Sequence, residues 1–211
     1  MSAELFTEID TDNTAAFAGM PNRWNSEWTA KATVEHADVA SLDGFLKRHY
    51  LGKRPGVCVC SLRLRVKGVP CGAIVFALPP PETETRYRCT VWELARLYLL
   101  QDLPRNSETW FIAKAIEHVK QCHREVGCLV SYADPEAGHA GTIYKASNWI
   151  YDGMTGDGRS TPRCDYIGSD GKKYARRSHI PNSISFTREP RSSKHRFMYP
   201  IRALKLTLPE S

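Results

Sequence analysis

The sequence has no apolar run of the roughly 18 residues that a membrane-spanning helix requires. Residues 1–14 are acidic and lack both a basic leader and an apolar segment, so we expect no secretory signal and a cytoplasmic location. Internal repeats, a phosphate-binding G-x-x-x-x-G-K-[ST] loop and a dinucleotide-binding glycine fingerprint are also absent. These absences exclude a membrane protein, a repeat protein and the commonest nucleotide-binding enzymes.

Cysteine pairing of the zinc-finger or disulfide kind is missing as well. The seven cysteines are odd in number and include no C-x-x-C pair. We therefore expect reduced, mostly buried thiols and no metal site. Cys58 and Cys60 lie two apart in a strand-like segment, which predicts that their side chains share one face, and a joint metal role is the alternative for them.

Acidic side chains are scarce in the last part of the chain. The formal net charge is +6. Residues 1–149 contain 17 basic and 17 acidic side chains, whereas residues 150–211 contain 12 basic and 6 acidic ones. A basic surplus confined to one segment is typical of a polyanion-binding surface, with a solvated tail as the alternative.

Length and periodicity predict one α/β domain over residues 1–211, with residues 1–28 as an N-terminal arm. The predicted strands are 31–36, two hairpin arms within 57–78, 89–99, 128–133, 149–151, two short strands around Asp170-Gly171, 183–188 and 195–206. The predicted helices are 38–50, 107–123 and one that begins near 135–138 and ends before 149.

Punctuating residues set the expected boundaries. Pro79–Pro81 predict an extended linker, followed by a charged loop. Ser107 or Asn106 is expected to cap the helix that follows the polar loop, and Gly127 to stop it. The expected architecture is a central mixed sheet with helices on it and extra β-hairpin elements near the C-terminus.

Two glycines weaken the stretch DPEAGHAGTIYKASNWIY, residues 134–151, as a helix. Gly138 and Gly141 would each cost up to about 1 kcal/mol relative to alanine inside a helix. A segment that brings bare backbone against a bound substrate would explain both glycines. The alternative is that they serve packing.

The element order and the run Tyr144-Lys-Ala-Ser-Asn-Trp149 resemble the GNAT acyltransferase superfamily, whose fourth helix commonly ends Y-x-x-x-G-F. Here Asn148 replaces the glycine, and asparagine tolerates the left-handed backbone of a helix end better than most residues. The resemblance implies a GNAT-like fold with a mixed, mostly antiparallel central sheet flanked by helices.

Three motifs, ELARLYLL, LPRNSETWFIAKAI and A-D-P-x-x-G-H-x-G-x-I-Y-x-A-x-N-W, together resemble the Mom family of DNA-modifying GNAT-like proteins from phages and prophages. The resemblance covers about residues 49–151. It implies a transferase that converts the exocyclic amine of adenine in double-stranded DNA to a carbamoylmethyl derivative, inside the bacterial host. Such bulky marks protect phage DNA from restriction enzymes.

The implied product restricts the donor. Residues 101–107, QDLPRNS, lack the Gln/Arg-x-x-Gly-x-Gly/Ala signature with which ordinary GNAT enzymes wrap the coenzyme A pyrophosphate. Acetyl-CoA would supply two carbons but no amide nitrogen, whereas glycyl-tRNA would supply both. Glycyl-tRNA and acetyl-CoA therefore stay open as donors, with tRNA as the carrier in the first case.

The resemblance also assigns catalytic roles. Tyr144 would protonate the leaving group, and Asp134, His49 or His139 would act as the base or orient it. The structural alternatives are a helix N-cap for Asp134, a surface or capping residue for His49, a residue that orients the helix start for His139 and a core aromatic for Tyr144.

Donor-binding and DNA-binding residues follow from the same comparison. A splayed backbone N–H around Leu97–Leu99 would face the acyl oxygen, and alternation places Arg96 on the opposite sheet face from Glu93. The expected donor-binding residues are Arg96, Leu97, Tyr98, Leu99, Asn106, Ser107, Gly141 and Asn148. The expected DNA-binding residues are Tyr50, Trp149, Lys172, Lys173, Arg176, Arg177, Lys194 and Arg196, with Trp92 and Asn148 as further candidates for the base pocket.

Two other functions remain possible from the sequence. A GNAT enzyme could acylate a protein or a small amine, with an incidental basic tail. A GNAT-shaped protein could also bind nucleic acid without activity. The missing pyrophosphate glycines argue against the first, and the intact run of residues 134–149 argues against the second.

Overall fold

The computed structural model describes residues 26–157, 163–174 and 177–202. Most of the predicted N-terminal arm, residues 1–28, and the predicted DNA-binding residue Arg176 lie outside this range. No helix in the described part of the chain is long and apolar enough to cross a membrane.

Alternating apolar residues form the expected strands. The strands are β1 (Ala32–His36), β2 (Cys58–Val66), β3 (Val69–Ala77), β4 (Val91–Leu99), β5 (Cys128–Ala133), β6 (Ile150–Met154), β7 (Cys164–Gly168), β8 (Lys173–Tyr174), β9 (Phe186–Pro190) and β10 (His195–Pro200). The helical elements are α2 (Ser26–Thr29), η2 (Val39–Leu42), α3 (Asp43–Arg48), α4 (Pro81–Tyr87), α5 (Ser107–Cys122), η3 (Pro135–Ala137), α6 (Thr142–Ala146) and η4 (Arg177–His179).

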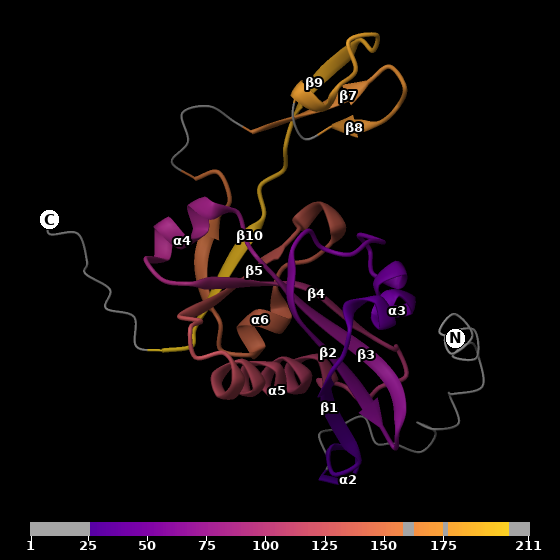
Figure 1. The fold of residues 1–211 in the computed structure, drawn as a ribbon, viewed down its shortest axis with the longest axis vertical. Helices are drawn as coiled ribbons and strands as arrows, with labels where there is room; N and C mark the ends of the chain where they lie inside the picture. The colour runs from indigo at the N-terminus through magenta and orange to yellow at the C-terminus, as the bar shows by residue number, and fades with distance from the viewer. Residues whose placement is uncertain (1–25, 158–162, 175–176, 203–211) are drawn as a thin grey trace, which may run out of the picture.

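Among the described residues, seven strands form one sheet in the order β1-β2-β3-β4-β5-β10-β6. Only β4 and β5 pair in parallel, and the remaining neighbours are antiparallel. The predicted mixed, mostly antiparallel sheet is therefore confirmed. A second sheet, β8-β7-β9, stands apart at the top of Figure 1. That the chain forms a single domain stays a prediction.

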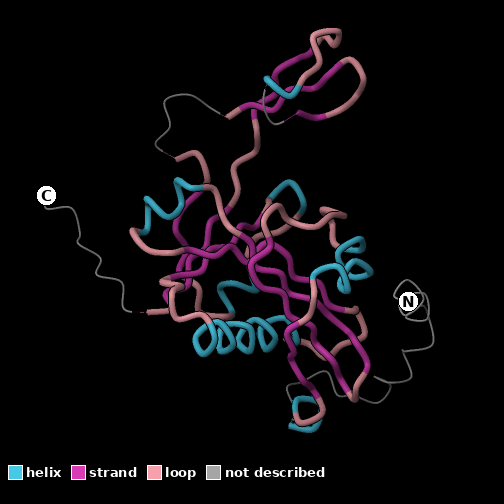
Figure 2. The backbone as a smooth tube through the Cα atoms, viewed as in Figure 1, coloured by secondary structure: helices cyan, strands magenta, loops and turns pink. Residues whose placement is uncertain are grey.

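The sheet is covered on both faces (Figure 2). On β3, Ile74 and Phe76 belong to the core beneath α5, whereas Ala73 and Val75 pack with Phe45 of α3. This division follows from the alternation of side chains along a strand. Each fully buried large apolar side chain stabilises the fold by about 1.5–3 kcal/mol.

Pro80 is extended as predicted, with φ −55° and ψ 142°, but the charged loop predicted after the prolines is wrong. Pro81 begins α4, which runs to Tyr87 and ends with Arg88 in the left-handed conformation. Proline is favoured at the first helical position, because the N–H that it lacks has no intrahelical partner there. Glu82 and Glu84 add favourable negative charge near the helix start.

The helix α5 has nearly the predicted bounds, but its ends are made differently from the prediction. The helix ends at Cys122, before Gly127. Asn106 occupies the N-cap position, but its side chain makes no capping hydrogen bond there. The hydroxyl of Ser107 donates to Pro104 O instead. The preceding turn rather than a side-chain cap therefore fixes the start of α5.

A β-bulge corrects the placement of the two strand cysteines. Cys58 pairs with Ala77 and Cys60 with Phe76, so one extra residue, Val59, lies between them. Cys58 consequently packs in the core on the α3 side, and Cys60 in the core beneath α5. The two thiols lie on opposite faces rather than on one.

The glycines of residues 134–151 flank helical turns rather than interrupt a helix. Gly138 ends η3 with φ +75°, and Gly141 precedes α6 with φ +74°. The segment is thus two short turns instead of the single helix predicted. A Cβ at Gly141 would lie 2.2 Å from Phe197 Cε2, whereas one at Gly138 would meet nothing within 4 Å.

These two glycines form a matched pair for a stability test. Gly138→Ala should cost about 1–2 kcal/mol, the strain of a left-handed residue that carries a Cβ. Gly141→Ala should cost about 1–3 kcal/mol more, because it also overpacks the Phe197 ring. Urea denaturation of both variants measures the difference. Equal losses of unfolding free energy would show that Phe197 does not hold Gly141 in place.

Candidate active site

A pocket of about 480 Å³ opens where β4 and β5 separate. The two strands pair only from Val91–Cys128 to Glu93–Val130 and diverge beyond that point. The pocket volume is within the usual range of about 300–1,000 Å³ for small-molecule sites. Its walls come from the end of α3 and the next residues, from β4, from the end of β5, from residues 138–144 and from Lys194.

A β-bulge in β4 sets which side chains enter the pocket. Arg96 pairs with Val75 and Leu94 with Phe76, so Ala95 is the extra residue. The expectation from alternation, that Arg96 and Glu93 face opposite ways, is therefore wrong, since both line the pocket. The divergence also begins directly after Glu93, earlier than the predicted Leu97–Leu99.

Glu93 is the carboxylate inside the pocket. Burial raises its pKa, and the positive charges of Arg96 and Lys194 offset only part of that effect. Arg96 is buried, donates to Lys53 O and Ala95 O, and has a pKa lowered mainly by burial. A carboxylate with a raised pKa is a stronger base than an ordinary glutamate and is suited to accept a proton from a substrate.

Tyr144 lies at the inner end of the pocket and is buried. The Ser131 hydroxyl oxygen is 2.7 Å from the Tyr144 hydroxyl and 2.8 Å from Leu94 O. Because a serine hydroxyl has one hydrogen and a carbonyl only accepts, a Ser131 that donates to Leu94 accepts from Tyr144. Burial raises the pKa of Tyr144 to about 12, so its phenol keeps its proton at neutral pH.

His49 follows α3 and lines the pocket. Burial, with smaller effects from Arg96 and His139, lowers the pKa of His49 to about 4. Its ring is therefore neutral at pH 7. Leu51 N–H donates to Nδ1 of this ring at 3.2 Å, which places the hydrogen of the neutral ring on Nε2. His49 is thus arranged to donate a hydrogen bond rather than to accept a proton.

An aromatic row follows His49. The ring of Tyr50 lies 4.5 Å from that of His49 and 4.9 Å from that of His139, measured between centroids. Tyr50 is 49% exposed and all three rings line the pocket. The row offers a planar substrate a stacking surface.

Asp134 behaves as a structural residue. Its Oδ1 accepts from Glu136 N–H and caps η3, and its Oδ2 lies 3.0 Å from Lys194 Nζ. Among the described pocket-lining residues Lys194 is included and Asp134 is not. The predicted helix-cap role therefore fits the geometry better than the predicted base.

A sequence model of the Mom protein family matches residues 33–205. The chain belongs to the Mom protein family. It is 39% identical over 61 residues to the methylcarbamoylase Mom of Escherichia phage Mu, an alignment that covers 29% of this chain and 25% of the Mu protein. The match thus spans about a quarter of the length of that relative.

The fold of this Mom-family chain is similar to those of solved acetyltransferases. A Bacillus subtilis acetyltransferase in complex with CoA has a TM-score of 0.51 at 10% identity, covering 81% of this chain and 99% of that one. A GNAT family acetyltransferase from Elizabethkingia anophelis with acetyl-CoA bound has a TM-score of 0.50 at 10% identity, covering 81% and 98%. These likenesses confirm the predicted GNAT-like fold.

The pocket brings together about half of the residues predicted for this Mom-family site. Those lining it are His49, Tyr50, Arg96, Leu97, Tyr98, His139, Gly141, Tyr144 and Lys194. Of the other described candidates for donor binding, Leu99, Asn106, Ser107 and Asn148 lie elsewhere. Asn148 does adopt the predicted left-handed conformation, with φ +60°.

Both tryptophans proposed to stack on DNA bases are core residues. Trp149 is 5% exposed and packs 5.3 Å from the Tyr144 ring and 5.8 Å from the Tyr199 ring. Trp92 is 6% exposed and packs against Phe76 and His123. Neither ring is accessible to an extruded base, and Tyr50 is the exposed aromatic at the pocket.

The described members of the predicted DNA-binding cations lie in three places, and one of them, Lys194, lines the pocket and pairs with Asp134. Lys172, Lys173 and Arg177 belong to the three-stranded sheet and its surroundings and are exposed. Arg196 instead forms an ion pair with Asp152 at 2.7 Å and also donates to Asp152 O. Its side chain is 14% exposed, so it supports β10 and β6 rather than facing outward.

Sequence reasoning missed Glu93 as a pocket residue and overlooked Ser131 and Tyr132. A usable signal existed, since Glu93 and Ser131 are polar residues inside the otherwise apolar strands VWELA and CLVSYA. Polar groups in core strands are uncommon unless they are paired or functional.

The buried position of His49 predicts an acid titration. Its ring should stay neutral until the pH falls to about 4, whereas an unperturbed histidine titrates near about 6.5. Protonation of His49 is therefore less favourable in the folded state than in the unfolded state. As a result, the free energy of unfolding decreases as the pH falls from about 6.5 toward 4. Ring-proton NMR of the wild type, assigned with His49→Gln, measures the midpoint.

Two arginine variants distinguish burial from the charge of Arg96 as causes of the lowered His49 pKa. Arg96→Gln should raise the His49 pKa only part of the way, because burial is the larger cause. Arg65→Gln, which removes a guanidinium paired with Glu35, should leave it unchanged. A wild-type midpoint near 6.5 would contradict the buried, neutral ring.

Proposed function

We propose that this Mom-family protein transfers a two-carbon, nitrogen-containing group to the exocyclic amine of adenine in double-stranded DNA and so protects phage or prophage DNA from restriction. The observation that carries the proposal is the pocket at the β4–β5 divergence. It combines a buried tyrosine, a carboxylate with a raised pKa and a stacked aromatic row.

The acceptor amine must first leave its base pair. Within a duplex the adenine amine is hydrogen-bonded and stacked, so an enzyme that acts on it extrudes the nucleotide into a pocket. The exposed Tyr50 ring, between those of His49 and His139, is placed to stack on such a base at the pocket entrance. The Nε2–H of His49 would hydrogen-bond to the base or to the acyl oxygen.

Glu93 is the proposed base. An aromatic amine is a poor nucleophile, and its attack on a carbonyl requires removal of a proton as the bond forms. Glu93 points into the pocket and carries a raised pKa, whereas both oxygens of Asp134 have partners. Arg96 and Lys194 would hold the carboxylate in place and stabilise the negative charge of the donor.

Tyr144 is the proposed acid, and its raised pKa bears on the donor. A phenol with a pKa of about 12 transfers its proton uphill to a thiolate, whose conjugate acid has a pKa near about 8.5 in cysteine. An alkoxide released from an ester is far more basic, so the transfer is then downhill. This difference in pKa favours an ester donor such as glycyl-tRNA in the proposed mechanism over the thioester acetyl-CoA.

The glycyl route accounts for every atom of the product. The adenine amine attacks the glycyl carbonyl, the ester alcohol leaves with the proton of Tyr144, and Glu93 takes the amine proton. The free glycyl amine then attacks the ring carbon and displaces the original nitrogen. That nitrogen becomes the amide of the resulting carbamoylmethyl amine.

The exposed cations of the three-stranded sheet would hold the DNA backbone. Lys172 and Lys173 lie on the hairpin formed by β7 and β8, and Arg177 follows β8. Phosphate contacts fix the position of a protein on a duplex without reading its sequence. The three-stranded sheet would thus orient the duplex while the pocket receives the base.

Nucleoside analysis tests the proposed activity. The chain is expressed in a bacterium, and its DNA is digested and measured by mass spectrometry. Part of the deoxyadenosine should gain the mass of one glycyl unit. Tyr144→Phe and Glu93→Gln should each lower the modified fraction by about 10²–10⁴-fold.

Two matched variants serve as controls. Tyr199→Phe changes a tyrosine of β10, and Glu117→Gln a carboxylate of α5, and both lie outside the pocket lining. Both should keep wild-type modification. Cells that contain folded wild-type protein could instead have unmodified deoxyadenosine and carry new acyl groups on proteins or small amines. That result would show that the acceptor is not DNA.

Labelled glycine tests the donor. With carbon-13 and nitrogen-15 glycine in a reconstituted reaction, the modified base should carry both carbon labels. The nitrogen-15 should be bonded to the purine ring, and the amide nitrogen should be unlabelled. Fragmentation of the nucleoside separates the two nitrogens. Carbon label from acetyl-CoA, and none from glycine, would establish the thioester donor.

A further inference from the structure

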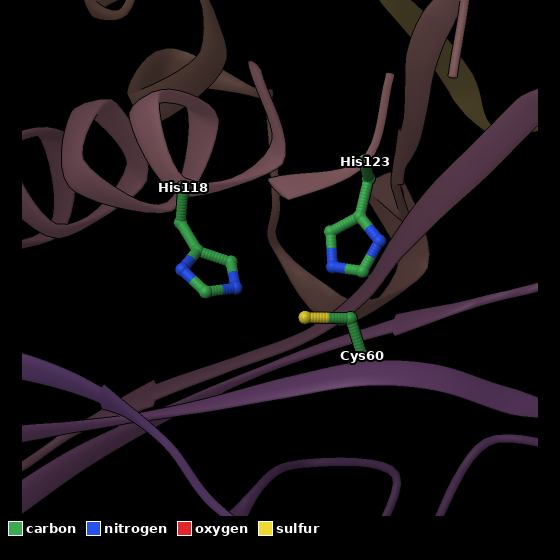
Figure 3. A group of neighbouring side chains, drawn as sticks. All are labelled: Cys60, His118 and His123. Carbon is green, nitrogen blue, oxygen red and sulfur yellow. The ribbon is translucent and has the colours of Figure 1, made fainter. Parts of the chain in front are cut away.

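Three potential metal ligands converge on the α5 face of the sheet, outside the candidate active site. Cys60 comes from β2, His118 from α5, and His123 directly follows that helix (Figure 3). One ligand atom of each residue lies within 4.8 Å of the other two. None of the three lines the pocket formed by the described residues.

The two imidazoles are oriented toward the thiol. Figure 3 shows a ring nitrogen of each histidine pointing toward the Cys60 sulfur. The Nδ1 of His118 lies 3.9 Å from Cys122 Sγ, and the Nδ1 of His123 lies 3.4 Å from a Glu125 carboxylate oxygen. Both Nε2 atoms therefore remain for a central ligand. Outer partners of this kind are the usual way in which metal-bound histidines are oriented.

The spacing of the ligand atoms is close to that of a tetrahedral metal site. Zinc–sulfur and zinc–nitrogen bonds of about 2.3 and 2.0–2.1 Å place ligand atoms about 3.5 Å apart. Small side-chain rotations from separations within 4.8 Å are sufficient to reach this distance. The two histidines are also separated by four residues, within the H-x₃₋₅-H spacing that zinc sites use.

The surroundings keep the ligands partly dry. Cys60 is 4% exposed, and the Trp92 ring packs on His123 at 4.6 Å between centroids.

We propose that Cys60, His118 and His123 bind one Zn²⁺ ion, with water as the fourth ligand, and that this ion joins β2 to the end of α5. One thiolate and two imidazoles form a donor set that suits zinc. On binding, the Cys60 thiol loses its proton to solvent and its sulfur bonds to the metal. Because the metal binds the thiolate, binding weakens as the pH falls.

Cobalt titration of the full-length protein, after removal of metal with a chelator, tests the site. About one equivalent of Co²⁺ should bind and produce a thiolate-to-cobalt charge-transfer band in the near ultraviolet, and Zn²⁺ should abolish the band. Cys60→Ser should remove the band. Cys71→Ser, which alters a buried thiol of the neighbouring strand that donates to Leu64 O, should keep it.

Substitution of Glu125, whose carboxylate contacts the His123 ring, tests the same site without changing a core residue. Glu125 is 58% exposed, and Glu125→Gln should weaken Zn²⁺ binding by about 10–100-fold, as loss of an outer partner does elsewhere. Glu117→Gln, at a 54% exposed glutamate on α5, should leave the affinity unchanged. Zn²⁺ should raise the melting temperature of the wild type but not that of His118→Gln.

Three results would overturn the proposal. They are the absence of stoichiometric Co²⁺ or Zn²⁺ binding by the folded wild type, a charge-transfer band that survives Cys60→Ser, and equal affinities for Glu125→Gln and Glu117→Gln. If Cys60→Ser does not fold, the glutamate pair decides between the outcomes, because both positions are exposed. DNA modification is measured separately, so its failure would leave this test intact.

Discussion

The site depends on the early end of the parallel pairing between β4 and β5. Backbone groups that lose a ladder partner inside a protein require another one. At the first unpaired position of each strand, the Ser131 hydroxyl of β5 lies 2.8 Å from Leu94 O of β4 and replaces a ladder bond. The same hydroxyl contacts Tyr144. The group that bridges the two strands where their pairing ends therefore also orients the proposed acid.

The β-bulges at Ala95 and Val59 determine which functional side chains lie on each face of the sheet. Without Ala95 as an extra residue, Arg96 would face away from Glu93, and only one of the two side chains could line the pocket. Without Val59 as an extra residue, Cys58 and Cys60 would share a face instead of lying in different parts of the core. A bulge shifts the register by one residue, and every side chain that follows it then points to the opposite face of the sheet. Each bulge therefore affects the rest of its strand.

Periodicity therefore predicted the elements better than the site. The alternation that predicted β2 to β5 also predicted the wrong sheet face for Arg96, because a bulge cannot be recognised in a pattern of apolar residues. His139 and Tyr144 were found through the motif of residues 133–149, and Tyr50 was named because an extruded base requires an aromatic partner. Trp149 was misplaced because a large aromatic near a site is as often core as contact.

Composition alone likewise did not locate the polyanion-binding surface. Part of the basic surplus of residues 150–211 is paired within the fold, as in Arg196–Asp152 and Arg163–Glu82. Exposed pairs such as the second are worth only about 0–1 kcal/mol, so a phosphate can replace the carboxylate at small cost. The first pair is only partly exposed, so separating its charges costs more. The proposed contact surface for DNA therefore follows exposure, which favours the three-stranded sheet over β10.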